Sequence, residues 1–396
     1  MKVGILTFHW ATNYGAVLQC YALQQTLTRL GMDVEVINYK PRRYDDSLYR
    51  FFKQHKYKNL TEYSTLRKKE RAIGVFRRKN LNLTRRVHTC AEIGKLAKRY
   101  DLIVSGSDQV MNPSFLMWGE SSKRRSPSYF LGFPYEGRRV AYAVSFGCVE
   151  YPQEARELAT HYMGAFDAIG VRENTGVAIV ESMGRSDAVV VPDPTILLPS
   201  EYYDSLATEG GRRGCRGVES GDYAYCFFLR NEEERRAQLG AVMSDKGLPF
   251  EELMWNNDDG DYSMQGWLCK IRNAKCVLTD SFHCMVMCLK LHKPFVVITE
   301  VEGNEGMNDR FYSLLGRFGL SERVVYKGAL ASQTIALDKS ASKDSFLTLN
   351  KDNEEKNGFA VIERVLNAPI DWSSIENHLQ TYATVGEEFV GQFETK

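Results

Sequence analysis

Short apolar runs alternate with stretches of helical periodicity along most of the chain. Residues 3–8 form the first apolar run, and apolar side chains then recur at helical spacing from residue 16 to residue 30, where Gly31 ends the pattern. A second apolar run covers residues 33–38. These three segments predict a β-α-β unit, and the right-handed crossover of such units makes its two strands parallel.

The same alternation continues, with one interruption, into the second half of the chain. A stretch rich in Gly, Arg and Ser at residues 210–221 is the best candidate for a linker. We expect strands at 101–104, 140–147, 168–173 and 188–191 before it, strands at 223–229, 276–279 and 295–298 after it, and a helix at 282–291.

This pattern predicts an α/β protein with two Rossmann-like domains facing a cleft. The length agrees, because 396 residues have room for two such domains and 43% apolar residues can fill their cores. We place the N-terminal domain at residues 1–209, the C-terminal domain at 222–350 and a helical tail at 351–396. In sheets of this kind, ligands bind beyond the carboxyl ends of the strands.

Charge is unevenly distributed along the chain. The net charge of the whole chain is only +1, which argues against a polyanion-binding protein, but residues 40–86 hold sixteen Lys or Arg against four Asp or Glu. Two interpretations of this basic segment stay open. It is either a solvated helical insertion in the first domain or a surface that docks on anionic lipid or on a phosphorylated acceptor.

The cysteines and the N-terminus predict a cytoplasmic protein. The nine cysteines include no Cys-x-x-Cys pair and mostly lie in apolar runs, as buried free thiols do. The N-terminal residues lack the features of a signal peptide, and no apolar stretch approaches the roughly 20 residues that span a bilayer.

The first candidate for ligand binding is the loop of Asn13, Tyr14 and Gly15, which precedes a predicted helix. Exposed backbone N–H groups at such a place favour an anionic or hydroxyl-rich ligand. The loop is not Gly-x-Gly-x-x-Gly, so it does not predict dinucleotide binding or redox chemistry. The alternative is a tight turn in which Gly15 permits close packing.

Two polar clusters directly follow predicted strands. Asp108 and Gln109 lie in the first, where a carboxylate can act as a base or bind a sugar hydroxyl, although Ser and Asp also cap helices. Asp280, Ser281 and His283 lie in the second, where a histidine at a helix start can bind phosphate or transfer a proton. The alternative for His283 is a core histidine bonded to the backbone.

Arg172 and Arg310 are the candidate cations for a carboxylate or phosphate, because a guanidinium fork matches both groups. The alternative for Arg172 is an ion pair with Glu173 or a neighbour. No metal is expected, because Cys284, Cys288 and His292 are spaced too far apart on a helix for one tetrahedral ion. The Asp-x-Asp sequence at residues 259–261 is a weak match to a metal-binding motif of glycosyltransferases.

Taken together in order and spacing, these segments resemble the polysaccharide pyruvyl transferases. The matching pieces are GILTF at residues 4–8, NYGAVLQ at 13–19, VSGSDQ at 104–109, AYAVSFG at 141–147, VRE at 171–173, DPT at 193–195, VLTDSFH at 277–283, and Arg310 with SLL at 313–315.

The resemblance implies a fold similar to GT-B glycosyltransferases and a transfer of pyruvate from phosphoenolpyruvate to two hydroxyls of a bacterial surface sugar. The product is a cyclic ketal, phosphate leaves, and neither cofactor nor metal is expected. His283 matches the family's donor-site histidine, and Arg172 matches an arginine implicated with the donor. Two departures are Ser281, where many members carry arginine, and Cys284, where glycine is common.

The resemblance and the residues together assign a role to each candidate. Catalysis is expected from His283, Asp108 and Asp280; donor binding from Arg172, Ser281, His283 and Arg310; acceptor binding from Asn13, Tyr14, Gly15 and Gln109. A lipid-linked acceptor at the inner face of the membrane would give residues 40–86 a purpose. The alternatives are a glycosyltransferase that uses a nucleotide sugar and a non-catalytic relative that binds glycan.

Overall fold

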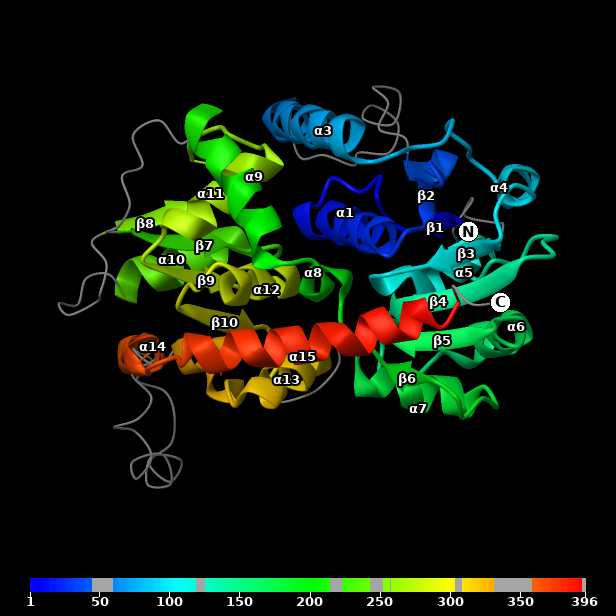
Figure 1. Ribbon diagram of the computed structural model, residues 1–396. Helices are drawn as coiled ribbons and strands as arrows, with labels where there is room; N and C mark the ends of the chain where they lie inside the picture. Colours follow the sequence, from blue (N-terminus) through cyan, green and yellow to red (C-terminus); the bar gives the residue numbers. More distant parts are fainter. Residues whose placement is uncertain are drawn as a thin grey trace. The chain divides into compact units, whose positions relative to one another are not determined.

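The computed structural model divides into two compact units. It describes residues 1–44, 60–118, 125–213, 223–242, 252–256, 258–302, 308–330 and 358–393. Unit 1 comprises Met1–Pro199, Tyr262–Met264 and Leu379–Lys396, and unit 2 comprises Ser200–Asp261 and Gln265–His378. Each unit contains one parallel sheet (Figure 1). Within the described ranges, no helix has the length and apolar character that crossing a membrane requires.

The sheet of unit 1 has six parallel strands in the order β2-β1-β3-β4-β5-β6. Hydrogen bonding pairs Val3 with both Val34 and Leu102, which fixes the register of the three strands at one end of the sheet. The strands are β1 (Lys2–Leu6), β2 (Asp33–Val36), β3 (Leu102–Ser105), β4 (Arg138–Val144), β5 (Ala168–Val171) and β6 (Val189–Val190).

This strand order determines where unit 1 can bind a ligand. The chain passes from β1 outward to β2 and then crosses back to β3 on the other side of β1. The loops that follow β1 and β3 therefore diverge at the carboxyl edge of the sheet, which is the usual place for ligands in open α/β folds.

Helix α1 (Tyr14–Arg29) is almost entirely enclosed in unit 1. The Asn13 side chain caps its N-terminus, and Gly31, at φ +82°, permits the left-handed turn after its last residue. Figure 1 shows α1 alongside α3 (Leu60–Asn80), and the rings of Tyr21 and Phe76 join the two helices at 5.6 Å. The other helices of unit 1 are α4 (Cys90–Ala97), α5 (Pro113–Trp118), α6 (Gln153–Met163), α7 (Asn174–Ser182) and α8 (Pro194–Leu197), with 3₁₀ turns η1 (Arg42–Tyr44) and η2 (Gln109–Met111).

The sheet of unit 2 repeats the same topology with five parallel strands. Their order is β11-β10-β9-β7-β8, so the chain again turns back between its first and third strands, β7 and β9. The strands are β7 (Tyr223–Phe227), β8 (Glu252–Trp255), β9 (Cys276–Thr279), β10 (Phe295–Thr299) and β11 (Val324–Tyr326). The helices are α9 (Ser200–Arg213), α10 (Glu232–Val242), α11 (Met264–Asn273), α12 (Phe282–Lys290), α13 (Asp309–Leu315) and α14 (Gly358–Asn367), with 3₁₀ turns η4 (Gly316–Phe318), η5 (Ser321–Arg323) and η6 (Lys327–Leu330).

The expected α/β class with two Rossmann-like sheets is confirmed. Two details differ from the sequence-based expectation. The units divide after Pro199, ahead of the expected linker, and helix α9 (Ser200–Arg213) already belongs to unit 2. The tail is shared between the units: α14 lies in unit 2, whereas α15 (Trp372–Gly391) belongs to unit 1 from Leu379 onward.

The structure describes residues 40–44 and 60–86 of the basic segment. The latter contains helix α3, whose last turn carries Arg77, Arg78 and Lys79. Residues 45–59 lie outside the described ranges, so docking of this segment on a membrane stays a prediction.

Candidate functional site

The loops after β1 and β3 in unit 1 are tied together by hydrogen bonds. The Thr7 hydroxyl donates to the Ser107 carbonyl at 3.0 Å. Gln19 in α1 bridges the same two loops, because its amide nitrogen donates to the Thr7 hydroxyl at 2.8 Å and its amide oxygen accepts from the Ser107 N–H at 3.2 Å. The carboxyl edge of this sheet is therefore a fixed scaffold for the polar residues that follow.

Asp108 occupies a backbone conformation that L-residues rarely adopt. Its φ is +77° and its ψ is −174°, a region populated almost only by glycine and strained for other residues. Its carbonyl accepts from the N–H groups of Val110 and Ser145 at 2.7 and 2.9 Å, which holds the strained backbone in place. Strain of this kind concentrates at functional sites.

Arg172 lies among three carboxylates at the end of β5. Its guanidinium is 3.6 Å from Asp108, 3.4 Å from Glu173 and 3.3 Å from Asp193, and its side chain is only 2% exposed. Burial alone would lower the pKa of Arg172, but the three carboxylates more than offset burial and raise that pKa. The Ser107 hydroxyl also donates to Asp193 at 3.1 Å, so the cluster joins the loop after β3 to the loop after β6.

The predicted acceptor residues gather on the loops after β1 and β3. The Asn13 side chain accepts from the Ala16 N–H at 3.2 Å as the cap of α1, and Tyr14 and Gly15 are buried in the first turn. Gln109 is the first residue of the 3₁₀ turn η2. Its side chain lies against Gly147, because a Cβ placed on Gly147 would be 2.8 Å from the Gln109 amide oxygen. Their role in acceptor binding stays a prediction.

In unit 2, Asp280 joins the loops that follow β7 and β9. Its two carboxylate oxygens accept from the backbone N–H groups of Leu229 at 2.7 Å and Arg230 at 3.2 Å. Burial raises the pKa of Asp280, against the opposing effects of these two hydrogen bonds and of the Arg310 charge. These two hydrogen bonds make Asp280 a residue that fixes the loop, and its expected part in catalysis stays a prediction.

Ser281 and His283 begin helix α12. The Ser281 hydroxyl accepts from the Cys284 N–H at 3.4 Å as the N-cap, which gives the serine at this position a structural role. His283 lies in the first turn, 7% exposed, with its ring edge-on to Phe282.

Arg310 comes to the same end of the unit 2 sheet from helix α13. Its guanidinium lies 5.8 Å from the ring centre of Phe282 and 5.0 Å from that of Phe311. Asp280, Ser281, His283 and Arg310 are therefore brought together beyond the carboxyl ends of β9 and β10, whereas Arg172 belongs to unit 1.

The Asp-x-Asp sequence lies at the surface of unit 2, where the buried Lys270 side chain holds it. The buried Lys270 ammonium donates to the Asp259 carboxylate at 2.7 Å and to the carbonyls of Asn256 and Asp261 at 3.2 and 3.0 Å. Across the described residues, no group of three or more His, Cys, Asp or Glu side chains is placed to hold a metal ion.

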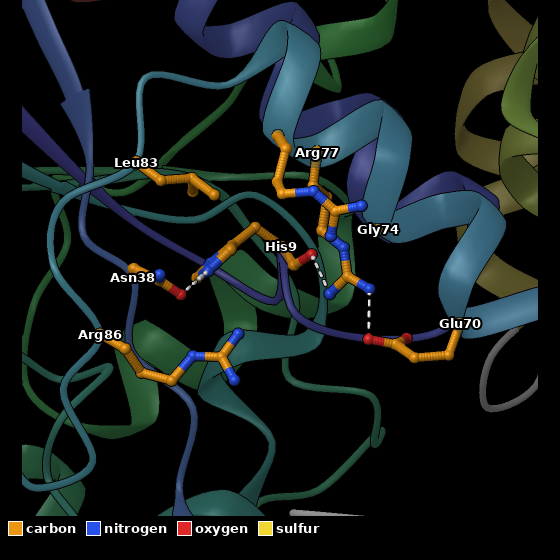
Figure 2. A pocket seen from close by; sticks show the side chains of 8 residues that line it. His9, Asn38, Glu70, Gly74, Arg77, Leu83 and Arg86 are labelled. Carbon is orange, nitrogen blue, oxygen red and sulfur yellow. Dashed lines mark hydrogen bonds and ion pairs between the residues drawn. The ribbon is translucent and has the colours of Figure 1, made fainter. Parts of the chain in front are cut away.

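Sequence reasoning missed a basic pocket in unit 1. His9, Asn38, Glu70, Gly74, Arg77, Arg78, Leu83 and Arg86 line it (Figure 2). These residues come from the ends of β1 and β2, from α3 and from the segment after α3, and only the excess of arginine in residues 40–86 hinted at it.

The comparison with protein families agrees with this arrangement of residues. The family model of the polysaccharide pyruvyl transferases matches residues 13–300, which includes the loops after β3, β7 and β9 and the whole of α12. The chain belongs to the polysaccharide pyruvyl transferase family. No curated protein matches it by sequence.

Solved structures resemble the chain only distantly. The UDP-GlcNAc 2-epimerase of Neisseria meningitidis, bound to UDP-GlcNAc, is 10% identical with a TM-score of 0.48, and the alignment covers 98% of this chain and 100% of the other. The UDP-GlcNAc 2-epimerase of Methanocaldococcus jannaschii is 12% identical with a TM-score of 0.47, covering 98% and 99%. The glycosyltransferase SnogD of Streptomyces nogalater is 12% identical with a TM-score of 0.40, covering 99% of each chain.

Proposed function

We propose that the chain transfers the pyruvyl group of phosphoenolpyruvate to two hydroxyls of one sugar in a bacterial surface polysaccharide precursor. The products are a cyclic pyruvate ketal and inorganic phosphate. The observation that carries the proposal is the family match over residues 13–300, which spans the loops that hold Asp108 and His283. The position of those loops at the carboxyl edges of two parallel sheets supports it.

The chemistry requires an acid, a base and cations. Protonation of the methylene carbon of phosphoenolpyruvate makes the neighbouring carbon electrophilic, and the first sugar hydroxyl adds there and gives up its proton. Phosphate then leaves with the electron pair of its C–O bond, and the second hydroxyl adds to the resulting oxocarbenium carbon and loses its proton. One of the two hydroxyl protons balances the proton placed on the methyl group, and the other leaves with phosphate or solvent.

In this proposal His283 binds the donor and supplies the proton. It lies in the first turn of α12, where backbone N–H groups and the helix dipole favour the phosphate of the donor. Arg310, near the same loop, adds positive charge for the phosphate or the carboxylate. Asp280 fixes the loop through its two backbone hydrogen bonds.

Asp108 is the proposed base for the acceptor hydroxyl. Its side chain is 18% exposed, so it can reach a substrate, whereas Arg172 beside it is enclosed. Arg172 acts in this proposal by orienting the Asp108 carboxylate through their 3.6 Å contact. Its direct contact with the donor, implied by the family resemblance, stays a prediction.

A phosphate-release assay tests the proposal. Release should require both phosphoenolpyruvate and an acceptor glycan, and His283→Ala should slow turnover about a hundredfold or more. His161→Ala is the matched control, because His161 is an exposed histidine on α6. Turnover of His283→Ala within a few-fold of the wild type would remove His283 from the mechanism.

A further inference from the structure

The basic pocket of unit 1 is small and strongly charged. Its volume is about 80 Å³, and its lining includes three arginines against one glutamate, Glu70. A water molecule needs roughly 10–15 Å³ by the same kind of measure, so the pocket has room for a group of a few heavy atoms, such as a phosphate. The geometry thus suits an anionic substituent of a larger molecule.

One of the three arginines is a fixed part of the pocket wall. Arg77 is 6% exposed, and its guanidinium donates to the Trp10 carbonyl at 2.9 Å and pairs with Glu70 at 2.6 Å. Glu70 in turn accepts from the Thr12 hydroxyl at 2.6 Å. The Arg77–Glu70 pair therefore fastens α3 to the loop between β1 and α1, and its charges largely cancel.

The other two arginines, Arg78 and Arg86, are exposed side chains that line the same cavity. In Figure 2 the Arg86 side chain extends toward the space that His9 and Arg77 border. Because the Arg77 charge is balanced by Glu70, these two forks give the pocket its excess positive charge. Guanidinium forks bind phosphate oxygens through paired, charge-assisted hydrogen bonds.

His9 forms the floor of the pocket and is 1% exposed. Its Nδ1 lies 3.3 Å from the Thr7 carbonyl oxygen and its Nε2 lies 3.2 Å from the Asn38 side-chain oxygen. Burial, with the Arg77 and Arg86 charges, lowers its pKa to about 4. Near neutral pH the imidazole is therefore uncharged and neither adds to nor offsets the charge of the arginines.

We propose that this pocket binds a phosphate group carried by the acceptor saccharide, a step that rests on the proposed function. The pocket borders His9 and the loop that ends at Asn13, so a phosphate held there would place the attached sugar beside the loops expected to bind the acceptor. The pocket has room for a phosphate group, and the two exposed guanidinium forks supply its counter-charge.

Binding is tested first, without turnover. Isothermal titration of the full chain with a hexose 1-phosphate and with inorganic diphosphate should show binding that weakens about tenfold or more in Arg78→Gln/Arg86→Gln. The matched control is Arg71→Gln/Arg85→Gln, which removes the same two charges from exposed residues of the same helix and segment outside the pocket. Equal weakening in both double variants, or none in the first, overturns the proposal.

Turnover then separates the acceptor from the donor. For a phosphorylated acceptor, KM should rise about tenfold or more in Arg78→Gln/Arg86→Gln, with KM for phosphoenolpyruvate unchanged. A rise in KM for phosphoenolpyruvate alone overturns the proposal, because the pocket would then serve the donor. If the wild type forms no ketal on any acceptor, the proposed function fails, whereas the binding result still decides whether the pocket takes sugar phosphate.

A lipid surface is the other source of phosphate groups. Vesicles of phosphatidylcholine with phosphatidylglycerol test it by co-sedimentation. Binding to the hexose 1-phosphate that depends on Arg78 and Arg86 supports the acceptor. The proposal is overturned in favour of a membrane headgroup if vesicle binding depends on these two arginines and the chain does not bind the soluble sugar phosphate.

Discussion

The guanidinium of Arg172 lies 3.6 Å from the carboxylate of Asp108, a residue held in a left-handed backbone conformation. The same guanidinium also contacts Glu173 and Asp193, so one enclosed cation balances three carboxylates. The contact connects the loop after β3 with the end of β5.

Removal of the Arg172 charge should destabilise unit 1. Arg172→Met leaves three carboxylates without their shared counter-charge, and the loss of one partner from a buried ion pair costs about 3–5 kcal/mol. Arg172→Lys keeps the positive charge but lacks the guanidinium fork, so its free energy of unfolding should fall by less. Urea unfolding measures both variants. A free energy of unfolding for Arg172→Met within about 1 kcal/mol of the wild type would contradict this account of the cluster.

The backbone conformation of Asp108 predicts that a glycine variant is more stable than an alanine variant, the reverse of the usual order. Asp108→Ala and Asp108→Gly both remove the carboxylate, but only glycine adopts φ +77° without strain. Since such strain costs about 1–3 kcal/mol, the glycine variant should be the more stable of the two, although glycine is ordinarily about 0.5–1 kcal/mol worse than alanine.

Both Asp108 variants should also lose turnover about a hundredfold or more if Asp108 is the base. Thermal unfolding and the phosphate-release assay measure the two effects separately. An alanine variant at least as stable as the glycine variant would argue against strain at this position, and retained turnover would argue against the assigned role.

Ser281 should act as a helix cap. Ser281→Ala removes the acceptor for the Cys284 N–H and should cost about 1 kcal/mol of stability, whereas Ser281→Gly should cost only a few tenths. Neither change removes a charge, so turnover at saturating phosphoenolpyruvate should stay near the wild type. A large fall in turnover with unchanged stability would mean that the hydroxyl contacts the donor.

His9 should make the stability of unit 1 depend on pH. Its pKa is about 4 in the folded chain against 6.5 as the ordinary value, so between these values the unfolded chain binds the extra proton. The contribution of neutral His9 to the free energy of unfolding is fully present above pH 6.5 and is lost as the pH falls toward 4. His9→Gln removes this dependence.

The difference between wild type and His9→Gln should therefore change by up to about 1.4 kcal/mol per pH unit in that window. Urea unfolding of both proteins in phosphate-free buffers, from neutral to mildly acidic pH, measures it. Parallel pH profiles for the two proteins would show that His9 is not held neutral by its surroundings.

Local sequence patterns predicted both sheets and the loops that carry the candidate site. Apolar runs followed at once by polar residues placed Asp108 and His283 beyond the ends of β3 and β9, because the strand and its loop are contiguous in sequence. Strands β8 and β11 were not predicted. They are the two edge strands of the unit 2 sheet and are only partly buried, so neither shows the continuous apolar run of β7, β9 and β10.

Tertiary contacts explain what the sequence could not reveal. The pocket unites His9, Arg77 and Arg86, which are distant in sequence and meet only because α3 packs against α1. Asp280 looks in the sequence like any carboxylate after a strand, and its hydrogen bonds to the loop after β7 depend on strand order. Similarly, only the fold brings Lys270 to Asp259.

Mass spectrometry of the acceptor tests the central claim most directly. A candidate lipid-linked glycan is incubated with the full chain and phosphoenolpyruvate, and the product is compared with a reaction that contains His283→Ala. The account predicts that the wild type adds to one sugar the mass of pyruvate less one water, in a group that mild acid removes. An unchanged acceptor, or a sugar added from a nucleotide sugar in place of this group, would contradict it.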